Sequence, residues 1–210
     1  MIVDCISDLH GYHPRLKGGD MLIVAGDLTA RDVLDEYFYF CEWMQSLKYD
    51  KKIVIAGNHD GCLQSGKFDF SDYSDSFDYL MDSGTIHDGF HIWGSPWTCT
   101  FGRWSFMLPK EKLKQKWNLI PDNTDILITH SPSYGILDKN VKGESCGCPD
   151  LREKVEEIKP RLHVFGHIHE ESGYCMLKYP SAIKTETICL NAAVMNEKYM
   201  PLNKPTRVIF

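Results

Sequence analysis

Short runs of apolar residues, many of them β-branched, recur along the chain and predict strands. Most of these runs are continuous rather than alternating, which is typical of strands whose two faces are both covered. The runs span residues 2–6, 21–25, 52–56, 91–93, 126–129, 162–165, 187–190 and 207–210. The pattern therefore predicts sheet structure buried between other layers.

Apolar positions at spacings of three and four predict helices between these runs. The predicted helices span residues 31–47, 72–81, 111–117 and 149–158. Strands that alternate with helices indicate an α/β fold, and the strand-rich part after Gly166 indicates a second sheet. We expect one domain over residues 1–210, built as a four-layer α-β-β-α sandwich of two mixed sheets flanked by helices. Residues 61–70 and 131–149 lack periodicity and are predicted to be loops.

Composition changes this picture little. The 210 residues are 43% hydrophobic and 25% charged, as in an ordinary soluble domain. A net charge of −6 argues against a surface for duplex nucleic acid, which is usually basic. No run approaches the roughly 20 apolar residues that cross a bilayer, and no signal peptide is recognisable, so we expect a cytoplasmic protein without a membrane partner. The eight cysteines form no C-x-x-C pair and are expected to be mostly buried thiols, with Cys146 and Cys148 in a loop.

Polar blocks follow five of the apolar runs. They are D-x-H at 8–10, G-D at 26–27, G-N-H-D at 57–60, T-H at 129–130 and G-H-x-H at 166–169. We expect these blocks to meet, because open α/β sheets bind ligands at the carboxyl ends of their strands. Carboxylate, imidazole and amide ligands without a thiolate suit Mn, Fe, Zn, Co or Ni better than a structural zinc. The blocks predict a site for two divalent ions, with Mn²⁺ expected first, and a two-metal site points to phosphate ester hydrolysis.

The same ordered blocks resemble the signature of the calcineurin-like metallophosphoesterase superfamily, which is D-x-H, G-D, G-N-H-[DE], a single His and G-H-x-H. Residues 53–59, 94–98, 116–121 and 160–170 are also similar to the metallophosphoesterase-domain (MPPED) subfamily. That resemblance implies metal-dependent phosphodiesterase action, including action on cyclic nucleotides. Some members lack the last histidine of G-H-x-H, and this chain keeps His169, which implies a complete first metal site.

The resemblance also implies roles for single residues. Metal one would be held by Asp8, His10, Asp27 and His169, and metal two by Asp27, Asn58, His130 and His167, with Asp27 bridging. His59 would not bind metal but would donate a proton to the leaving oxygen. Asp60 has two open interpretations, since it could orient the His59 ring or cap the segment that follows.

Candidate substrate contacts are less specific. The Arg103 guanidinium is a candidate phosphate clamp, with a solvated surface arginine as the alternative. Trp97, Trp104 and Tyr134 are candidates for stacking on a nucleobase, although aromatic residues more often pack in a core. Asn58 is expected to stabilise charge on the phosphate oxygens, and Ser131 to lie with Tyr134 at the mouth of the site.

The sequence thus predicts a dinuclear metal-dependent phosphodiesterase in which a metal-bridging hydroxide attacks phosphorus and His59 protonates the leaving alkoxide. By resemblance, the substrate is a small-molecule diester, namely 2′,3′- or 3′,5′-cAMP or cGMP. Two alternatives stay open at this point. One is a phosphomonoesterase or phosphoprotein phosphatase, and the other is a nucleotide-binding regulator with little turnover.

Overall fold

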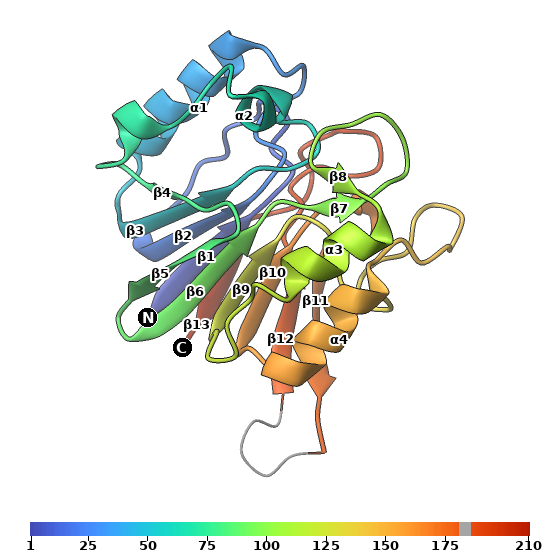
Figure 1. Cartoon of the computed structure of the whole chain (residues 1–210). Coiled ribbons are helices and arrows are strands. Elements are labelled where there is room, and N and C mark those ends of the chain that lie inside the picture. Colours follow the sequence, from blue (N-terminus) through green and yellow to red (C-terminus); the bar gives the residue numbers. More distant parts are fainter. Residues whose placement is uncertain (181–185) are drawn as a thin grey trace.

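Two β-sheets packed face to face form the centre of the computed structural model, which describes residues 1–180 and 186–210 (Figure 1). The first sheet has the order β13-β1-β2-β3-β4. Its strands are β13 (Thr206–Ile209), β1 (Ile2–Ile6), β2 (Gly19–Ala25), β3 (Tyr49–Ile55) and β4 (Asp78–Tyr79). The strands β1 to β4 run parallel, and β13 lies antiparallel to β1 at one edge.

The second sheet has the order β11-β12-β10-β9-β6-β5. Its strands are β11 (Gly173–Lys178), β12 (Glu186–Asn191), β10 (Leu162–Phe165), β9 (Ile126–Thr129), β6 (Phe90–Ser95) and β5 (Ser83–His87). The four inner strands are parallel, and both edge strands are antiparallel to their neighbours. A short parallel pair, β7 (Thr98–Cys99) with β8 (Met107–Leu108), follows β6 in the chain.

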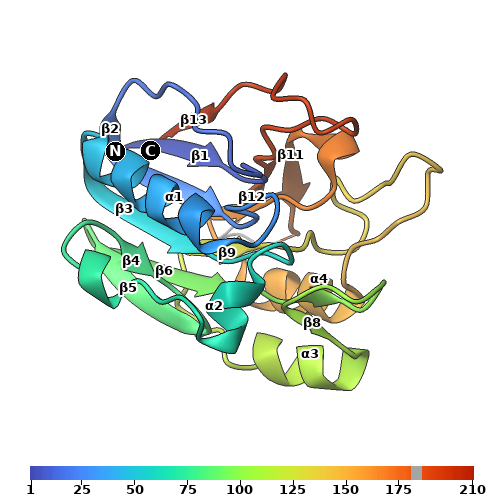
Figure 2. The ribbon, with the colours of Figure 1, turned by 90° about the horizontal axis from the view of Figure 1, so that it is seen from above.

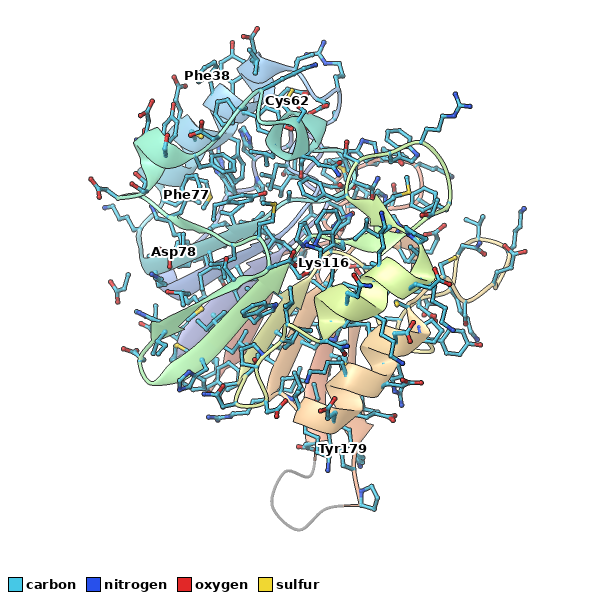
Figure 3. The ribbon with its side chains drawn as sticks, viewed as in Figure 1. Phe38, Cys62, Phe77, Asp78, Lys116 and Tyr179 are labelled. Carbon is cyan, nitrogen blue, oxygen red and sulfur yellow. The ribbon has the colours of Figure 1, made fainter. Side chains whose placement is uncertain are left out.

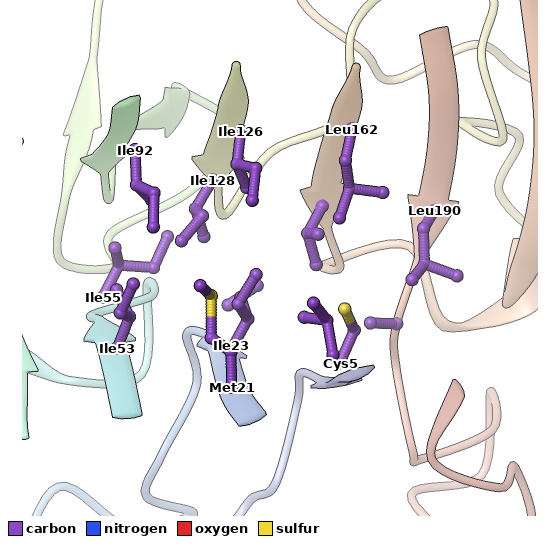
Figure 4. Close-up of a cluster of buried hydrophobic side chains, with 14 of the residues drawn as sticks. Cys5, Met21, Ile23, Ile53, Ile55, Ile92, Ile126, Ile128, Leu162 and Leu190 are labelled. Atoms are coloured by element: carbon purple, nitrogen blue, oxygen red, sulfur yellow. The ribbon is translucent and has the colours of Figure 1, made fainter. Parts of the chain in front are cut away.

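The continuous apolar runs face two cores, because successive side chains of a strand point to opposite faces. In β2, Ile23 lies between the two sheets, whereas Val24 points away from the second sheet. In β9, Ile128 lies in the same central core and Leu127 points outward. Figure 4 shows this central layer, where side chains of the first sheet meet those of the second. Both faces of these strands are therefore buried, as the runs predicted.

Helices cover the outer face of each sheet (Figure 2). The helices α1 (Leu34–Ser46) and α2 (Gly61–Ser65) pack on the first sheet, and α3 (Lys110–Trp117) and α4 (Pro149–Ile158) pack on the second. Tyr37, Phe40 and Met44 of α1 are fully buried against Leu22 and Val54 of the sheet. The predicted four-layer α-β-β-α arrangement is confirmed.

The helix predicted over residues 72–81 is wrong. A short 3₁₀ turn (Ser71–Tyr73) and the strand β4 occupy this segment. Phe77 packs in the layer under α1 (Figure 3), whereas Leu80 packs between the sheets. Residues three apart lie on the same face of a helix, so a helix could not send these two side chains into different layers.

Two further differences concern short elements. The segment 61–70, predicted as a loop, begins with α2, while 131–148 has no helix or strand beyond isolated bridges. After Gly166 the chain adds β11 and β12 to the second sheet, but its last strand, β13, returns to the first. The eight cysteines are free thiols, and five are buried. Among the residues that the structure describes, no helix has the length and apolar character that spanning a membrane requires.

Candidate metal centre

Side chains from five strand ends converge at one edge of the two sheets. They follow β1, β2 and β3 of the first sheet and β9 and β10 of the second. Three groups bring one donor atom per residue within 4.8 Å of each other. The groups are Asp8, His10 and His169; Asp8, Asp27 and His130; and His10, Asp27 and His59. Asp8, His10 and Asp27 each belong to two of the three groups, so the groups overlap and form one continuous cluster.

Left-handed backbone turns aim several of these side chains. Asp8, His10, Asp27 and His167 have φ values of 55°, 43°, 53° and 71°. Such values are uncommon for residues other than glycine, but Asp and His adopt them more readily than most. Gly57 and Gly166 permit the close approach, because a Cβ at either position would collide with the carboxylate of Asp27 or of Asp8.

Backbone carbonyl groups fix the tautomers of two histidines. His130 Nδ1–H donates to the Ala25 carbonyl at 2.9 Å, and His169 Nδ1–H donates to the Asn196 carbonyl at 3.1 Å. In the neutral rings each Nε2 then carries a lone pair, and a second hydrogen bond of this kind is typical of histidines that bind metal. The two Nε2 atoms point into the site, 3.3 Å from Asp27 Oδ1 and 3.2 Å from Asp8 Oδ1, respectively.

The remaining predicted ligands lie around these pairs. Asn58 Oδ1 is 3.0 Å from His130 Nε2, and His10 Nε2 is 3.7 Å from Asp27 Oδ2. The His167 ring lies 5.1 Å from that of His130, centroid to centroid, and its backbone N–H donates to Asp8. All seven predicted ligands are therefore brought together at one site.

The electrostatics of the site favour positive charge. Burial alone would lower the pKa of His130, but the Asp27 carboxylate raises it to about 9. Burial alone would raise the pKa of Asp8, and His169 nevertheless holds it at about 2. Burial lowers the pKa of His167 to about 4, which favours the neutral ring that a metal ligand needs, whereas His130 would lose its proton when an ion binds. Two buried carboxylates, one amide and four imidazoles fit a pair of divalent cations that prefer nitrogen and oxygen ligands.

His59 lies between the ligands and the open side of the site. Its backbone N–H donates to Asp27 Oδ1 at 2.8 Å. Its ring meets the edge of His10 at 4.6 Å and stacks on Trp104 at 4.4 Å, both between centroids. Within residues 1–180 and 186–210, neither His59 ring nitrogen makes a hydrogen bond. The ring thus lies beside the ligands with its polar atoms available, and its predicted role as proton donor stays a prediction.

The Asp60 side chain makes hydrogen bonds to the backbone of two loops rather than to the adjacent His59 ring. Its fully buried carboxylate accepts hydrogen bonds from the backbone N–H groups of Leu28 (3.0 Å), Thr29 (3.1 Å) and Gly57 (2.8 Å). Burial, and then the charge of Asp27, raise the pKa of Asp60 to about 7. Its side chain makes no capping bond to α2, so the capping alternative has no hydrogen bond behind it. The other alternative, orientation of the His59 ring, likewise has none in the described part of the chain.

A cleft of about 520 Å³ opens over the ligands. Its floor includes Asp27, Asn58 and His167, and its walls include three aromatic side chains: Phe101, Trp104 and Tyr199. Phe101 lies 5.1 Å from the His167 ring, and Tyr199 lies 5.0 Å from the rings of both His10 and His169. Each aromatic side chain thus contacts a ring of the site.

The predicted substrate contacts are distributed unevenly. Trp104 lines the cleft, and Arg103 lines a smaller cavity on the other side of His59. Trp97 lies outside the cleft lining, where its indole N–H donates to Asp82 and Lys116 lies over its ring. Tyr134 is exposed but also outside the lining, and Ser131 is fully buried rather than at the mouth. Substrate contact by Trp97 or Tyr134 stays a prediction that this cleft does not favour.

Sequence reasoning missed Phe101 and Tyr199. They lie in the segments that follow β6 and β12, which carry no motif and no periodic pattern. The available signal was topological, because these strands are parallel to β9 and β10 and so end at the same edge of the sheet.

Comparison with known proteins identifies the class. The family model of the calcineurin-like phosphoesterases matches residues 1–171. The human metallophosphoesterase domain-containing protein 1 is 38% identical, over 96% of this chain and 68% of its own length. A Caenorhabditis elegans protein, UPF0046 protein C25E10.12, is 34% identical over 92% of this chain and 75% of its own. A solved structure, TT1561 of Thermus thermophilus, has a TM-score of 0.60 at 14% identity, covering 90% of this chain and 88% of that one, and shows the shared fold.

The chain belongs to the calcineurin-like phosphoesterase family. Its members typically bind two divalent metal ions, and the ligand groups described above are the candidates for holding them here. Family membership indicates a metal-dependent phosphoester hydrolase.

Proposed function

We propose that the protein is a phosphodiesterase that cleaves small nucleotide-type diesters, with cyclic nucleotides as the substrates to test first. The observation that carries this proposal is the cleft, in which the ligand groups, His59 and three aromatic side chains lie side by side. Its volume of about 520 Å³ lies within the range of pockets that enclose small molecules. The aromatic side chains offer flat apolar faces of the kind on which bases stack.

The seven ligands each have a proposed part. Asp8, His10, Asp27 and His169 would hold one ion and Asp27, Asn58, His130 and His167 the other. The pair of ions, Mn²⁺ in our first test, would supply an activated water and neutralise charge on the phosphate. Asn58 would donate its amide N–H to a phosphate oxygen, and Arg103 would attract the phosphate from the neighbouring cavity.

His59 would protonate the oxygen that leaves phosphorus. This role suits a diester, because its leaving group is an alkoxide that needs a proton. The ring nitrogens of His59 make no hydrogen bond to the described residues, and His59 lines the cleft, which supports access of a substrate oxygen to its ring. We also propose a cytoplasmic setting, where thiols such as the eight of this chain stay reduced.

A panel of phosphate esters tests the proposal. Purified protein reconstituted with Mn²⁺, Fe²⁺, Zn²⁺, Co²⁺ or Ni²⁺ is assayed on bis-p-nitrophenyl phosphate, on p-nitrophenyl phosphate and on the four cyclic nucleotides. We expect faster turnover of the diester than of the monoester, and hydrolysis of at least one cyclic nucleotide. A preference for the monoester would favour a phosphomonoesterase. Tight nucleotide binding without turnover under any metal would favour a regulator.

Removal of the proposed proton donor tests the mechanism. His59→Ala should keep its metal content and slow diester turnover by about 10²–10⁴-fold, most strongly for poor leaving groups. Elemental analysis and steady-state kinetics on activated and unactivated diesters measure both effects. An equal loss for good and poor leaving groups would contradict proton donation by His59.

A further inference from the structure

The ring of His59 is held by aromatic packing. Trp104 stacks on it with centroids 4.4 Å apart and planes inclined by 30°, while His10 meets its edge. Both His59 and Trp104 line the main cleft and also the cavity that contains Arg103, so the stacked pair forms the wall between the two. Trp104 is 51% exposed, and its indole contacts the site through this stack.

The loop that carries Trp104 is anchored to the segment that carries His59. The backbone N–H of Ser105, the next residue, donates to the Asn58 carbonyl at 3.1 Å. Phe106 is fully buried, and its N–H donates to Gln64 at 2.9 Å. A Cβ at Gly61 would lie 2.5 Å from Ser105 Oγ, which shows how closely the two segments approach. The hydrogen bond between Ser105 and Asn58, the residues next to Trp104 and His59, therefore helps to hold the two rings against each other.

The carboxylate next to His59 does not orient its ring, because it makes its hydrogen bonds elsewhere. Catalytic histidines commonly have a carboxylate that fixes the ring by a hydrogen bond. Here the adjacent carboxylate, Asp60, is fully buried and accepts hydrogen bonds from backbone groups of Leu28, Thr29 and Gly57. In the described part of the chain, no carboxylate makes a hydrogen bond to the His59 ring.

We propose that Trp104 is the positioning residue of His59 and that its stacked indole takes the place of an orienting carboxylate. This inference rests on the proposed function, in which His59 donates the proton. Water adds its oxygen to phosphorus and releases a proton to solvent, the bond from phosphorus to the leaving oxygen breaks, and the His59 ring proton passes to that oxygen. The neutral ring then regains a proton from solvent. Trp104 acts only by keeping the donor nitrogen directed toward the leaving oxygen.

Kinetics on a series of diesters with leaving groups of different basicity provide the first test. Trp104→Ala should slow the poorest leaving groups by up to about 10²-fold, the cost of a misplaced catalytic group, and affect the best ones little. Trp104→Phe should restore most of the loss, because it keeps a flat ring. Phe101→Ala is the matched control, since it removes a cleft ring that contacts His167 and should not change the dependence on the leaving group.

A double-mutant cycle separates this inference from the proposed function. In a His59→Ala background, Trp104→Ala should have no further effect on poor leaving groups. An undiminished effect in that background, or an equal effect on good and poor leaving groups, would overturn the inference and make Trp104 a binding residue. If His59→Ala itself shows no dependence on the leaving group, the proposed function of His59 fails instead.

The second test needs no turnover. In metal-free protein, the ring protons of His59, assigned by comparison with His59→Ala, should resonate upfield in proton NMR because they lie against the indole. Trp104→Ala should remove this shift, and Trp104→Phe should retain part of it. Identical His59 resonances in the natural protein and Trp104→Ala would show that the rings do not stack in solution, which would overturn the inference whatever the kinetics show.

Discussion

The floor of the cleft and its rim differ in how they are held, although both come from loops at the same edge of the two sheets. Of the floor residues, Asp27 and Asn58 are 4% exposed or less; the His59 backbone N–H donates to Asp27, and Asn58 Oδ1 lies 3.0 Å from Nε2 of the buried His130. The three aromatic residues of the cleft walls, Phe101, Trp104 and Tyr199, form what we call the rim. They are 51% to 58% exposed and lie in longer segments after β6 and β12. The difference teaches that the candidate metal ligands lie in a buried, hydrogen-bonded frame, while the groups that would meet the rest of a substrate lie on more open loops.

The largest effect is expected at the centre of the floor. Asp27→Ala should abolish activity, because this carboxylate belongs to two of the ligand groups and also accepts the His59 N–H. The loss of metal affinity should exceed the roughly 10–100-fold that is typical of residues that only support a ligand. Elemental analysis after reconstitution, together with turnover, measures it. Asp78→Ala removes a carboxylate that pairs with Lys51 on the surface and should bind metal normally. Full metal content in Asp27→Ala would refute the bridging role.

The next-largest effect is expected on stability, from the loss of the Asp60 carboxylate that braces the loops at the floor of the cleft. Asp60→Ala leaves three buried backbone N–H groups without an acceptor, at a cost of about 1–3 kcal/mol for each, so the free energy of unfolding should fall by about 3 kcal/mol or more. Urea unfolding of the metal-free protein measures it. The control Glu156→Ala, an exposed carboxylate on α4, should cost about 0.5 kcal/mol or less. Similar losses in the two variants would mean that Asp60 does not brace the loops.

A buried histidine on β10 should make stability depend on pH. The His163 ring, on β10, is fully buried with its Nε2 at 2.8 Å from Thr129 Oγ1, and burial lowers its pKa to about 3. The unfolded chain takes up a proton near pH 6.5, whereas the buried ring stays neutral, so stability falls as the pH decreases from about 6.5 toward 3. The slope from this residue is about 1.4 kcal/mol per pH unit. His163→Gln should remove this contribution to the pH dependence of stability. Urea unfolding from pH 7 to pH 4.5 compares the variant with the natural protein. Parallel curves would exclude His163 as the source.

The smallest effect is expected at the rim. Tyr199→Ala removes a cleft-lining ring on which the base of the substrate would stack, and an aromatic contact of this kind is worth about 0.5–1.5 kcal/mol. We expect KM to rise by about 2- to 12-fold with kcat little changed. Steady-state kinetics on a cyclic nucleotide measure both constants. Tyr174→Ala, on the exposed face of β11, should leave KM unchanged. A large loss of kcat in Tyr199→Ala would show that the rim also takes part in the chemistry.

The buried and the exposed parts of the molecule also differ in how well the sequence predicts them. The inner strands were predictable because burial of both faces leaves a continuous apolar run, as in residues 126–129 and 162–165. The ligands were predictable because each follows such a run within one to four residues. The edge strands β5 and β11 were not, because their half-exposed residues mix polar and apolar types. Strand β4 is two residues long and is defined by its pairing with β3, a contact with no local signal.

The residues around His59 show a second limit. The position of His59 follows from the motif, but the partner of its ring depends on how a loop 45 residues away returns to the site. The sequence left Asp60 with two interpretations, orienting the His59 ring or capping the next segment, and the structure directs its carboxylate to the backbone of two loops instead. Adjacency in sequence predicts which residues share a loop, whereas their hydrogen-bond partners are set by tertiary packing.

Asp8, His10, Asp27 and His167 share left-handed backbone angles, and this carries a consequence for protein engineering. Such conformations cost of order 1–3 kcal/mol each for residues other than glycine. Glycine at His10, for example, would relieve that cost while deleting a ligand. A thermostability screen run on the metal-free protein without an activity readout would therefore select the very changes that inactivate it. Any laboratory evolution of this scaffold needs catalysis, or bound ions, as part of the selection.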